Sequence, residues 1–573
     1  MPRRFREHDK RIVTDLRGIW DFAFLGDIEP DAVDLGAIDY ADRMAVPGCF
    51  DATPAYAGQR GLVAYRTRAW LHDDTPHRLI FDGVHHWCRV FVAGQAVRDH
   101  AGGFTRFSVD LTGHKAGEVE IVVLVDNRFN YERSPLHQEY FDWYHFGGIA
   151  RGVELHRLGT LWIDDVRVVT DDYATRAVTV TIAYSSSDSA TLGATTPGST
   201  RLAITCDEQI VLDEEVDLAA SSGTIVRTLH LTDAALWSPD APHLHLLHIQ
   251  LSEDDRRERI GIRQVRVEGE RVLINGEPVL LRGFCRHEFH PQFGHAQPEA
   301  LLIADVQQLL DMGCNFVRGS HYPQDLAFLD LCDEAGLCVW CETIGWQHTA
   351  KHLTDAHFVD AQLAHLQEMM TDAGNRPCVI MWGVLNEGHS HHAESRPAYQ
   401  TLLERLRELD PTRPVTYASN QPHGDKCFDL ADILSINTYP GWYHSSIAAI
   451  PGYLDDLMAL LDSKVVPAKP IIISEIGAGA IPGWRDWNNE RWTEQYQAQL
   501  LETVIRHLFI DRERACGLSI WLYNDFRTPQ NVARPRSYND KGVVDEYRRP
   551  KMAYDAVKRC FAQVSGLDNA NKS

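Results

Sequence analysis

Two glutamates in this sequence each follow an apolar run that is typical of a buried strand. Glu387 closes the stretch MWGVLNE, and Glu475 closes the stretch PIIISE. Two carboxyl groups that face each other about 5–5.5 Å apart can cleave a glycosidic bond by double displacement, because one attacks the anomeric carbon while the other protonates the departing oxygen. The ionised partner also keeps the pKa of the acid raised. Since the two residues lie far apart in the chain, only the fold can bring them together.

Other titratable residues near these glutamates allow further interpretations. Either glutamate alone could equally be a carboxylate at a helix N-terminus or in a solvated loop. Glu342, at the end of LCVWCE, is the rival carboxylate, and we expect it to support the pair. His389, His391 and His392 follow Glu387 in NEGHSHH; three imidazoles could hold a metal, but histidines in a polar loop are far commoner. We therefore predict no metal site and no cofactor.

Both glutamates belong to a region in which strand-like runs alternate with amphipathic segments. Residues 273–573 contain eight such runs, which is the pattern of a (β/α)8 TIM barrel. Catalytic groups in this fold lie at the C-terminal ends of the strands. Glu387 ends the fourth run and Glu475 the seventh, so we expect both at the mouth of the barrel. The runs are VLLRGF, CNFVRGSHYP, LCVWCETIGW, CVIMWGVLNE, PVTYAS, ADILSINTYP, PIIISEIG and GLSIWLYNDF.

The first part of the chain has a different pattern. Residues 1–161 contain short alternating or apolar runs broken by turn residues, such as HRLIFDGV and VEIVVLVDN, which predict a β-sandwich of jelly-roll type. Residues 162–272 continue the alternation in AVTVTIAY and HLHLLHIQL, which predicts a smaller immunoglobulin-like β-sandwich. Between its strands, SSSDSATLGATTPGS is expected to be a mobile hairpin loop.

The composition limits the partners and the compartment. The chain has 573 residues and a net charge of −24, which argues against nucleic acid or an anionic membrane as the main partner. No apolar run reaches the roughly 18 residues of a membrane span, and no apolar segment follows the basic start as in a secretory signal. The 12 cysteines are therefore expected to be reduced thiols of a cytoplasmic protein. Cys338 and Cys341, in CVWC, are expected to be buried rather than bound to a metal.

Longer motifs carry a resemblance to a known family. The three-domain order, LWSPDAPHLHLL, GIRQVRVEGERVLINGEPVLLRG and the two glutamates resemble glycoside hydrolase family 2, over about residues 15–560. Within this family, the barrel is most similar to the β-glucuronidases. The resemblance implies that Glu387 is the acid/base and Glu475 the nucleophile. It also implies that Asn386 binds the 2-hydroxyl of the sugar and that Tyr439, in NTYPGWY, steadies the nucleophile.

Three further site residues are implied by the same resemblance. His321, in RGSHYP, is expected to contact sugar hydroxyls, and Asp142, in FDWYHFGGI, to reach over the barrel mouth to the sugar. Trp521, at the end of the eighth run, is expected to form the floor of the sugar pocket. Each has a structural alternative: support of the site for His321, a turn cap for Asp142, and core packing for Trp521.

The identity of the sugar depends on the stretch ARPRSYNDKGVV. Asn539 and Lys541 match the Asn-x-Lys pattern with which β-glucuronidases hold the substrate carboxylate, and Tyr443 matches its usual helper. A local cluster of Arg534, Arg536 and Lys541 could attract an anionic sugar to an acidic protein, because a Debye length of roughly 8 Å screens the distant surface. Similar Asn-Asp-Lys-Gly runs nevertheless occur in family members that act on galactosides.

The sequence therefore predicts a retaining exo-β-glycosidase that releases terminal β-D-glucuronic acid from a small glycoside or oligosaccharide. The same mechanism on β-galactosides or β-galacturonides is the alternative, because Ile476 and Pro440 stand where tyrosine is common in β-glucuronidases. A function of another class is non-catalytic carbohydrate binding on a retired barrel, which would be expected to lose at least one of Asn386, Glu387, Tyr439 and Glu475. The aglycone and the linkage stay open. Relatives often assemble through their sandwich domains, so a homo-oligomer is an open alternative to a monomer.

Overall fold

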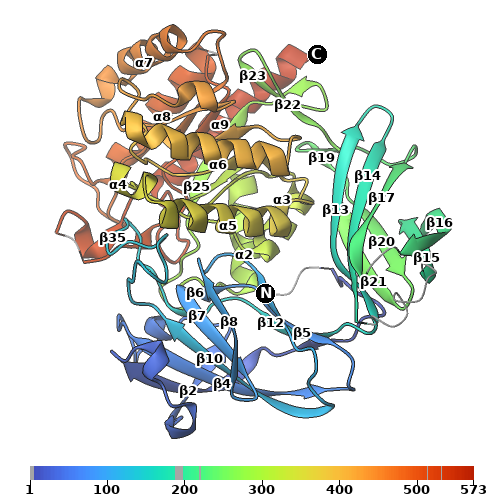
Figure 1. Ribbon diagram of the computed structural model, residues 1–573. Helices are drawn as coiled ribbons and strands as arrows, with labels where there is room; N and C mark the ends of the chain where they lie inside the picture. Colours follow the sequence, from blue (N-terminus) through green and yellow to red (C-terminus); the bar gives the residue numbers. More distant parts are fainter. Residues whose placement is uncertain (1–4, 188–197, 219–220, 513, 531, 573) are drawn as a thin grey trace.

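The computed structural model describes residues 5–187, 198–218, 221–512, 514–530 and 532–572. The chain forms the three parts that the sequence predicted: a sandwich that follows the N-terminus, a second sandwich, and a barrel that carries the C-terminus (Figure 1). The centre of the predicted hairpin loop lies outside the described residues. None of the helices in the described part of the chain is long and apolar enough to cross a membrane.

The N-terminal sandwich consists of two antiparallel sheets around one apolar core. One sheet has the order β3-β2-β4-β10-β7-β8 and the other the order β1-β12-β5-β9. Alternate residues of a strand point inward, as in β5, where His77, Leu79 and Phe81 are buried. The strands are β1 (Val13–Asp15), β2 (Gly18–Gly26), β3 (Asp42–Val46), β4 (Leu62–Leu71), β5 (His77–Phe81), β6 (Val84–His85), β7 (Trp87–Val92), β8 (Gln95–Ala101), β9 (Phe107–Asp110), β10 (Gly117–Asp126), β11 (Gly148–Ile149) and β12 (Val153–Arg157).

The second sandwich is smaller and has the two-sheet form that the alternation predicted. Its sheets have the orders β13-β14-β17 and β16-β15-β20-β21 and enclose a separate apolar core. Its strands are β13 (Leu161–Asp172), β14 (Ala177–Ser186), β15 (Gly198–Cys206), β16 (Gln209–Leu218), β17 (Ser222–His230), β20 (His245–Leu251) and β21 (Asp254–Ile260). Short strands lead on towards the barrel: β18 (Trp237–Ser238), β19 (Ala241–Pro242), β22 (Val265–Glu268), β23 (Arg271–Ile274) and β24 (Glu277–Pro278).

The barrel is a closed parallel sheet of the eight predicted strands. The fifth is interrupted at Tyr417, so that β29 pairs with β28 on one side and β30 pairs with β31 on the other. The sheet order is β29-β28-β27-β26-β25-β33-β32-β31-β30. The strands are β25 (Leu281–Arg286), β26 (Phe316–Gly319), β27 (Cys338–Glu342), β28 (Val379–Gly383), β29 (Val415–Thr416), β30 (Ala418–Ser419), β31 (Leu434–Asn437), β32 (Ile471–Glu475) and β33 (Gly517–Ile520).

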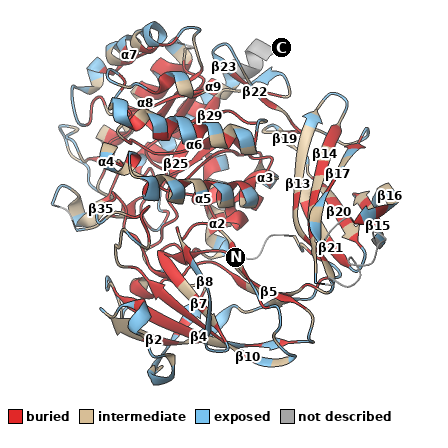
Figure 2. Cartoon of the chain, in the orientation of Figure 1, coloured by how far each residue is buried: buried red, intermediate tan, exposed pale blue. Residues whose placement is uncertain are grey.

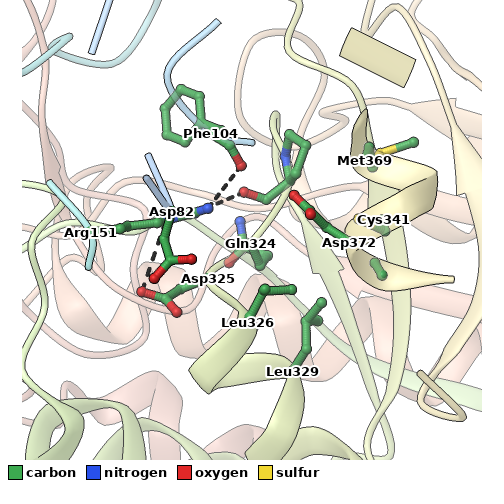
Figure 3. A pocket seen from close by; sticks show the side chains of 12 residues that line it. Asp82, Phe104, Arg151, Gln324, Asp325, Leu326, Leu329, Cys341, Met369 and Asp372 are labelled. Carbon is green, nitrogen blue, oxygen red and sulfur yellow. Dashed lines mark hydrogen bonds and ion pairs between the residues drawn. The ribbon is translucent and has the colours of Figure 1, made fainter. Parts of the chain in front are cut away.

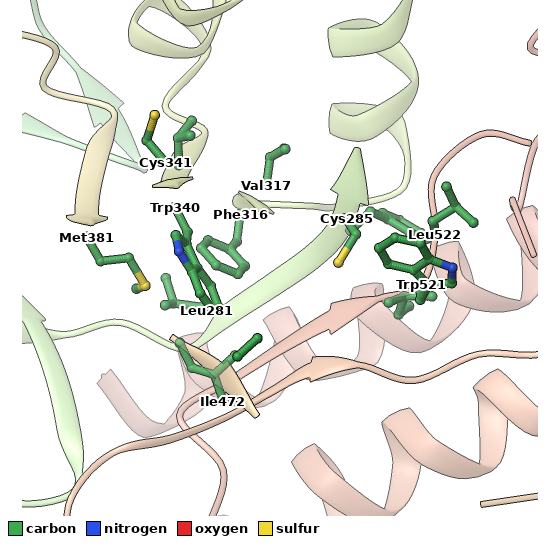
Figure 4. Packing of buried hydrophobic residues seen from close by; sticks show 14 of the residues in the cluster. Leu281, Cys285, Phe316, Val317, Trp340, Cys341, Met381, Ile472, Trp521 and Leu522 are labelled. Carbon is green, nitrogen blue, oxygen red and sulfur yellow. The ribbon is translucent and has the colours of Figure 1, made fainter. Parts of the chain in front are cut away.

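Helices surround the barrel with their apolar faces inward. The strands are buried throughout, whereas the outer faces of α5 and α6 are exposed (Figure 2). Inside the barrel, Leu281, Phe316, Trp340 and Ile472 pack against one another, so the interior is a filled core (Figure 4). The helices are α2 (Glu299–Asp311), α3 (Leu326–Ala335), α4 (Ala350–Leu353), α5 (Ala356–Ala373), α6 (Arg396–Leu409), α7 (Ile450–Lys464), α8 (Glu494–Arg506) and α9 (Met552–Lys572).

The cysteines agree with the prediction of reduced thiols. All twelve are buried and free. Cys338 and Cys341 are fully buried in β27, as expected for structural thiols, and burial raises the pKa of each to about 12. Neither therefore has the low pKa of a reactive thiolate.

A buried arginine fastens the N-terminal sandwich to the barrel. Arg151, which follows β11, donates hydrogen bonds to the carbonyls of Phe104 and Pro323 at 2.8 and 3.0 Å and pairs with Glu288 at 3.0 Å. Arg151, Phe104 and Pro323 line a small cavity that Asp372 of α5 also lines (Figure 3). Burial raises the pKa of Asp372 to about 7. The junction fixes the sandwich where its residues 134–146 contact the barrel mouth, through bonds such as Gln138 to the carbonyl of Trp346 at 3.2 Å.

Candidate active site

A cleft of about 440 Å³ opens at the C-terminal ends of the barrel strands. The N-terminal sandwich contributes two side chains to the walls of the cleft, Tyr140 and Asp142, and the barrel contributes the others. The barrel residues are Trp346, Gln347, Glu387, Asn420, Pro422, Asn437, Thr438, Tyr439, Tyr443, His444, Tyr453, Glu475, Trp521, Arg534 and Lys541. The two predicted glutamates therefore share one cleft, although a long stretch of chain separates them.

The position of Glu387 corrects one detail of the sequence prediction. Glu475 is the last residue of β32, as expected, but β28 ends at Gly383 and Glu387 lies beyond it. Leu385 and Glu387 both have φ of 52°, so the chain turns out of the sheet after the strand. The N–H of Glu387 then bonds to the carbonyl of Ala418 at 2.9 Å. A contact with the neighbouring fifth strand thus sets where this carboxylate lies.

Two neutral amides hold the Glu387 carboxylate. Asn437, at the end of β31, donates to Oε1 at 2.9 Å, and Gln347, in the loop after β27, donates to Oε2 at 2.8 Å. The N–H of Gln347 also bonds to the carbonyl of Asn386 at 2.9 Å. Each carboxylate oxygen therefore has a fixed donor, which orients the group within the cleft.

Charged and phenolic donors hold the Glu475 carboxylate. Arg318, in β26, donates to Oε1 at 2.9 Å, and the Tyr439 hydroxyl donates to Oε2 at 2.5 Å. Burial and the nearby Glu387 carboxylate raise the pKa of Glu475 to about 8, whereas Arg318 and Tyr439 lower it. The guanidinium and the phenol thus oppose part of the effect of burial on this carboxylate.

Arg318 connects most of the buried polar groups below the cleft. It is fully buried and also bonds to Glu342 at 3.1 Å and to Oδ1 of Asn386 at 2.7 Å. Burial raises the pKa of Glu342 to about 7, against the effect of Arg318. Glu342 does not line the cleft but contacts Arg318 and His321, which is the supporting position expected for it.

His321 and Trp521 form a layer next to Glu475. Nδ1 of His321 lies 2.8 Å from Glu342, and its Nε2 lies 3.6 Å from Glu475. Burial lowers the pKa of His321 well below its usual value, so the imidazole is neutral. Its ring stacks on Trp521 with centroids 5.2 Å apart, and Trp521 in turn lines the cleft. Only 1% of His321 is exposed, Arg318 also lies 3.2 Å from its Nδ1, and its Nε2 has no hydrogen-bond partner among the described residues.

The side-chain amide of Asn386 has a hydrogen-bond donor without a partner among the described residues. Its Oδ1 accepts from Arg318 at 2.7 Å and from Asn437 at 3.0 Å. Its Nδ2 is buried and has no hydrogen-bond partner among the described residues. An unpaired buried donor is costly, and an oxygen of a bound molecule would satisfy it.

Asp142 and Arg534 form an ion pair on one wall of the cleft. Arg534 donates to both carboxylate oxygens of Asp142, at 3.0 and 2.6 Å, and Asn539 donates to the same carboxylate at 2.7 Å. Asn539 is fully buried and is not part of the cleft lining, so within the predicted Asn-x-Lys pattern only Lys541 faces the cleft. Asp142 therefore joins the sandwich to the barrel as well as lining the cleft.

Lys541 places a buried amino group beside Tyr443. Its Nζ donates to the Tyr443 hydroxyl at 3.1 Å and lies 5.7 Å from the ring of Trp442, and burial lowers its pKa. Arg536, which the sequence grouped with these cations, bonds instead to Glu546 and Asp540 and does not line the cleft. The predicted cluster of three cations is thus wrong in one member, because the chain at Arg536 has φ of 59° and turns that side chain away.

The imidazoles after Glu387 come together at the rim. Ring nitrogens of His389, His391 and His392 lie within 4.8 Å of one another, so these residues could hold a metal ion. None of the three lines the cleft. The predicted absence of a metal stays a prediction.

Three residues of the site were missed in the sequence. Arg318 stands in the same RGSHYP motif as His321, and a cation inside an apolar strand is a signal that a buried carboxylate faces it. Asn437 ends a strand just as Glu475 does. Gln347 had no such signal, because its role depends on a loop with φ of 51°.

Three sequence models of one family match the chain in succession. "Glycosyl hydrolases family 2, sugar binding domain" matches residues 65–159, and "Glycosyl hydrolases family 2" matches residues 162–263. "Glycosyl hydrolases family 2, TIM barrel domain" matches residues 265–565. Together they cover the second half of the first sandwich, the second sandwich and the barrel.

Individual relatives match over nearly the whole chain. A beta-glucuronidase of Paenibacillus borealis is 31% identical over 97% of both chains. A GH2 beta-galacturonidase from Eisenbergiella tayi, solved bound to galacturonate, has a TM-score of 0.90 and 33% identity over 98% of this chain and 99% of that one. A beta-D-glucuronidase from Dictyoglomus thermophilum has a TM-score of 0.83 and 27% identity over 97% and 98%.

Replacing Arg318 should destabilise the barrel strongly. In Arg318→Met, Glu342 and Glu475 stay buried without their cation, so we expect a loss of roughly 3–5 kcal/mol in unfolding free energy. Adding Glu342→Gln to this variant should recover part of the loss, because one uncompensated charge is removed. Urea denaturation followed by circular dichroism measures both. The control is Arg405→Met, whose ion pair with Glu408 is exposed and worth at most about 1 kcal/mol; equal midpoints for the two arginine variants would contradict this account.

Proposed function

The chain belongs to glycosyl hydrolases family 2, and on that premise we propose that it is a retaining exo-β-glycosidase that releases terminal β-D-glucuronic acid from glycosides. Membership in the family makes the chain an O-glycosyl hydrolase. The observation that carries the choice of a uronic acid is the Lys541 amino group, which is buried in the cleft wall beside Tyr443.

The first half of the reaction is a displacement at the anomeric carbon. Glu475 attacks this carbon, the bond to the leaving oxygen breaks, and Glu387 gives its proton to that oxygen. The Tyr439 hydroxyl and Arg318 hold the two oxygens of Glu475, so the attacking group is oriented before the substrate arrives. The product of this half is a glycosyl group bound covalently to Glu475.

The second half repeats the displacement with water. Glu387, now ionised, takes a proton from a water molecule whose oxygen attacks the anomeric carbon, and the bond to Glu475 breaks. Asn437 and Gln347 keep the Glu387 carboxylate in place through both halves. Two displacements at the same carbon leave the anomeric configuration unchanged.

The remaining cleft residues are assigned to the sugar. The unused Nδ2 donor of Asn386 would bond to the 2-hydroxyl, Trp521 would support the ring face, and Asp142 would accept from a hydroxyl. His321 would act through Glu475 and Trp521, which it contacts. The sugar carboxylate would take a charge-assisted hydrogen bond from Lys541, which a hydroxymethyl group cannot match.

β-Galacturonides are the second candidate substrates. A uronic acid of either kind carries the carboxylate that would pair with Lys541. Glucuronic and galacturonic acid differ only in the direction of the 4-hydroxyl. The likeness to the Eisenbergiella tayi beta-galacturonidase favours this alternative, and the likeness to the Paenibacillus borealis beta-glucuronidase favours the first proposal. Neutral β-galactosides rank below both, because they would leave Lys541 without an anion.

Chromogenic substrates compared side by side test the proposed function. We expect the aryl β-glucuronide to turn over faster than the β-galacturonide and far faster than the β-galactoside. Glu475→Gln should lower turnover by several orders of magnitude without loss of the folded structure, because nucleophile and acid act as a unit. Turnover of the galactoside alone, or a sugar released with inverted configuration in the proton NMR spectrum, would overturn the proposal.

Removing the Lys541 amino group should change the choice of sugar. Lys541→Ala is expected to lower kcat/KM for the uronide by roughly 10–100-fold, the usual value of a hydrogen bond to a charged group. The effect on galactoside turnover should be much smaller, so the ratio of the two is the quantity to measure. Lys558→Ala, whose side chain is 46% exposed on the far helix α9, is the matched control. An equal loss on both substrates would mean that Lys541 is only structural.

The rate should also fall on the acidic side. Glu475 must be ionised to attack, and burial together with the nearby Glu387 carboxylate raises its pKa to about 8. Because protonation removes the nucleophile, kcat/KM should fall by about tenfold per pH unit as the pH drops below that value. A kcat/KM profile from pH 5 to 10 with an aryl uronide measures this limb; a rate that stays level down to pH 5 would contradict it.

A further inference from the structure

Two aromatic side chains from different domains meet at the rim of the cleft. Tyr140 comes from residues 134–146 of the N-terminal sandwich, and Trp346 comes from the barrel loop after β27. Their rings lie 5.8 Å apart at an angle of 61°, and both line the cleft. Tyr140 is 42% exposed, which is unusual for a large aromatic ring that only fills space.

The surroundings of Trp346 relate this pair to the acid/base. Trp346 forms a backbone bridge with Asn386, and the next residue, Gln347, donates to Oε2 of Glu387 at 2.8 Å. Lys541, in contrast, donates a hydrogen bond to the Tyr443 hydroxyl and takes no part in these contacts. Glu387 protonates the oxygen that joins the sugar to its leaving group, so Trp346, which adjoins the residue bonded to Glu387, is placed on the leaving-group side.

The pair is held in place by its own supports. The carbonyl of Trp346 accepts a hydrogen bond from Gln138 at 3.2 Å, which ties the loop to the same stretch that carries Tyr140. Phe141 packs against the Trp346 ring with centroids 6.3 Å apart. The rings of Tyr140 and Trp346 are thus fixed relative to each other before any ligand binds, which lowers the entropy cost of binding.

We propose that Tyr140 and Trp346 form the leaving-group subsite and bind a ring by its flat apolar face. The ring is that of an aryl aglycone or of a second sugar in pyranose form, because both present such a face and a short alkyl chain does not. This inference rests on the proposed retaining mechanism, since it places the leaving group beside the acid/base. It extends that mechanism to the class of glycoside that the enzyme prefers.

Interception of the glycosyl-enzyme tests the subsite without depending on the donor sugar. An alcohol added to the reaction attacks the anomeric carbon, its proton passes to Glu387, and the bond to Glu475 breaks, so a new glycoside forms in place of the free sugar. Benzyl alcohol, methyl β-D-glucopyranoside and methanol are offered separately at equal concentration. The donor is whichever chromogenic glycoside the wild type hydrolyses. The measured quantity is the ratio of transfer product to free sugar for each alcohol.

We expect the wild type to favour a ring-bearing acceptor over methanol, and Trp346→Ala to reduce that preference roughly tenfold. Trp346→Phe should restore most of it, and Tyr140→Ala should reduce it in the same direction. Trp487→Ala is the matched control, because Trp487 is fully exposed and does not line the cleft. A preference for benzyl alcohol alone identifies an aryl subsite, and one for the glucopyranoside identifies a sugar subsite.

An unchanged preference in both Trp346→Ala and Tyr140→Ala would overturn the inference, as would a wild type that transfers to methanol as well as to either ring. If the proposal of a uronic acid is wrong, the uronides will not act as donors. The acceptor ratios could then still be measured with the galactoside, so the two proposals are tested separately.

Discussion

The buried guanidinium of Arg318 is the interaction on which the rest of the site depends. It is fully buried in β26, lies over the ring of Trp340 at 4.5 Å, and bonds to Glu342, Glu475 and Asn386 from three other parts of the barrel. A cation removed from water in this way needs anions around it, and each of the two carboxylates needs the cation. The requirement is mutual, so the strand ends that carry these groups are held together by charge as well as by packing.

The barrel alone leaves the cleft incomplete. Its strands bring the two carboxyl groups together, but the N-terminal sandwich supplies Asp142 and Tyr140 and is fastened to the barrel by the buried Arg151. The Asp142–Arg534 ion pair is a second attachment between the sandwich and the barrel, and it lies directly at the cleft. The side chains that line the cleft therefore come from two domains, whereas both glutamates come from the barrel alone. On the proposed function, a change in the position of the sandwich would alter selectivity without touching either glutamate.

Periodicity in the sequence was enough for the architecture and for Glu475, because a buried strand that ends in a carboxylate is a local signal. It was not enough for Glu387, whose place depends on positive φ at Leu385 and on a bond to Ala418. The roles of Arg318, Asn437 and Gln347 depend on partners distant in the chain. The sequence signals that Arg318 faces a buried carboxylate and that Asn437 ends a strand, but it does not name their partners, and it gives no signal for Gln347. Arg534 and Arg536 make the limit clear: they are almost adjacent, yet only Arg534 faces the cleft.

Burial has opposite effects on the pKa values of two charged groups in this cleft. It raises the pKa of Glu475, which Arg318 and Tyr439 oppose, and it lowers the pKa of Lys541, which makes the ammonium form costly without a counter-charge. On the proposed function, a uronic acid would bring that counter-charge with it and so recover the cost, whereas a neutral sugar would not. The same desolvation would therefore act on the nucleophile and on the choice of sugar, and the net charge of −24 on the chain matters little at this short range.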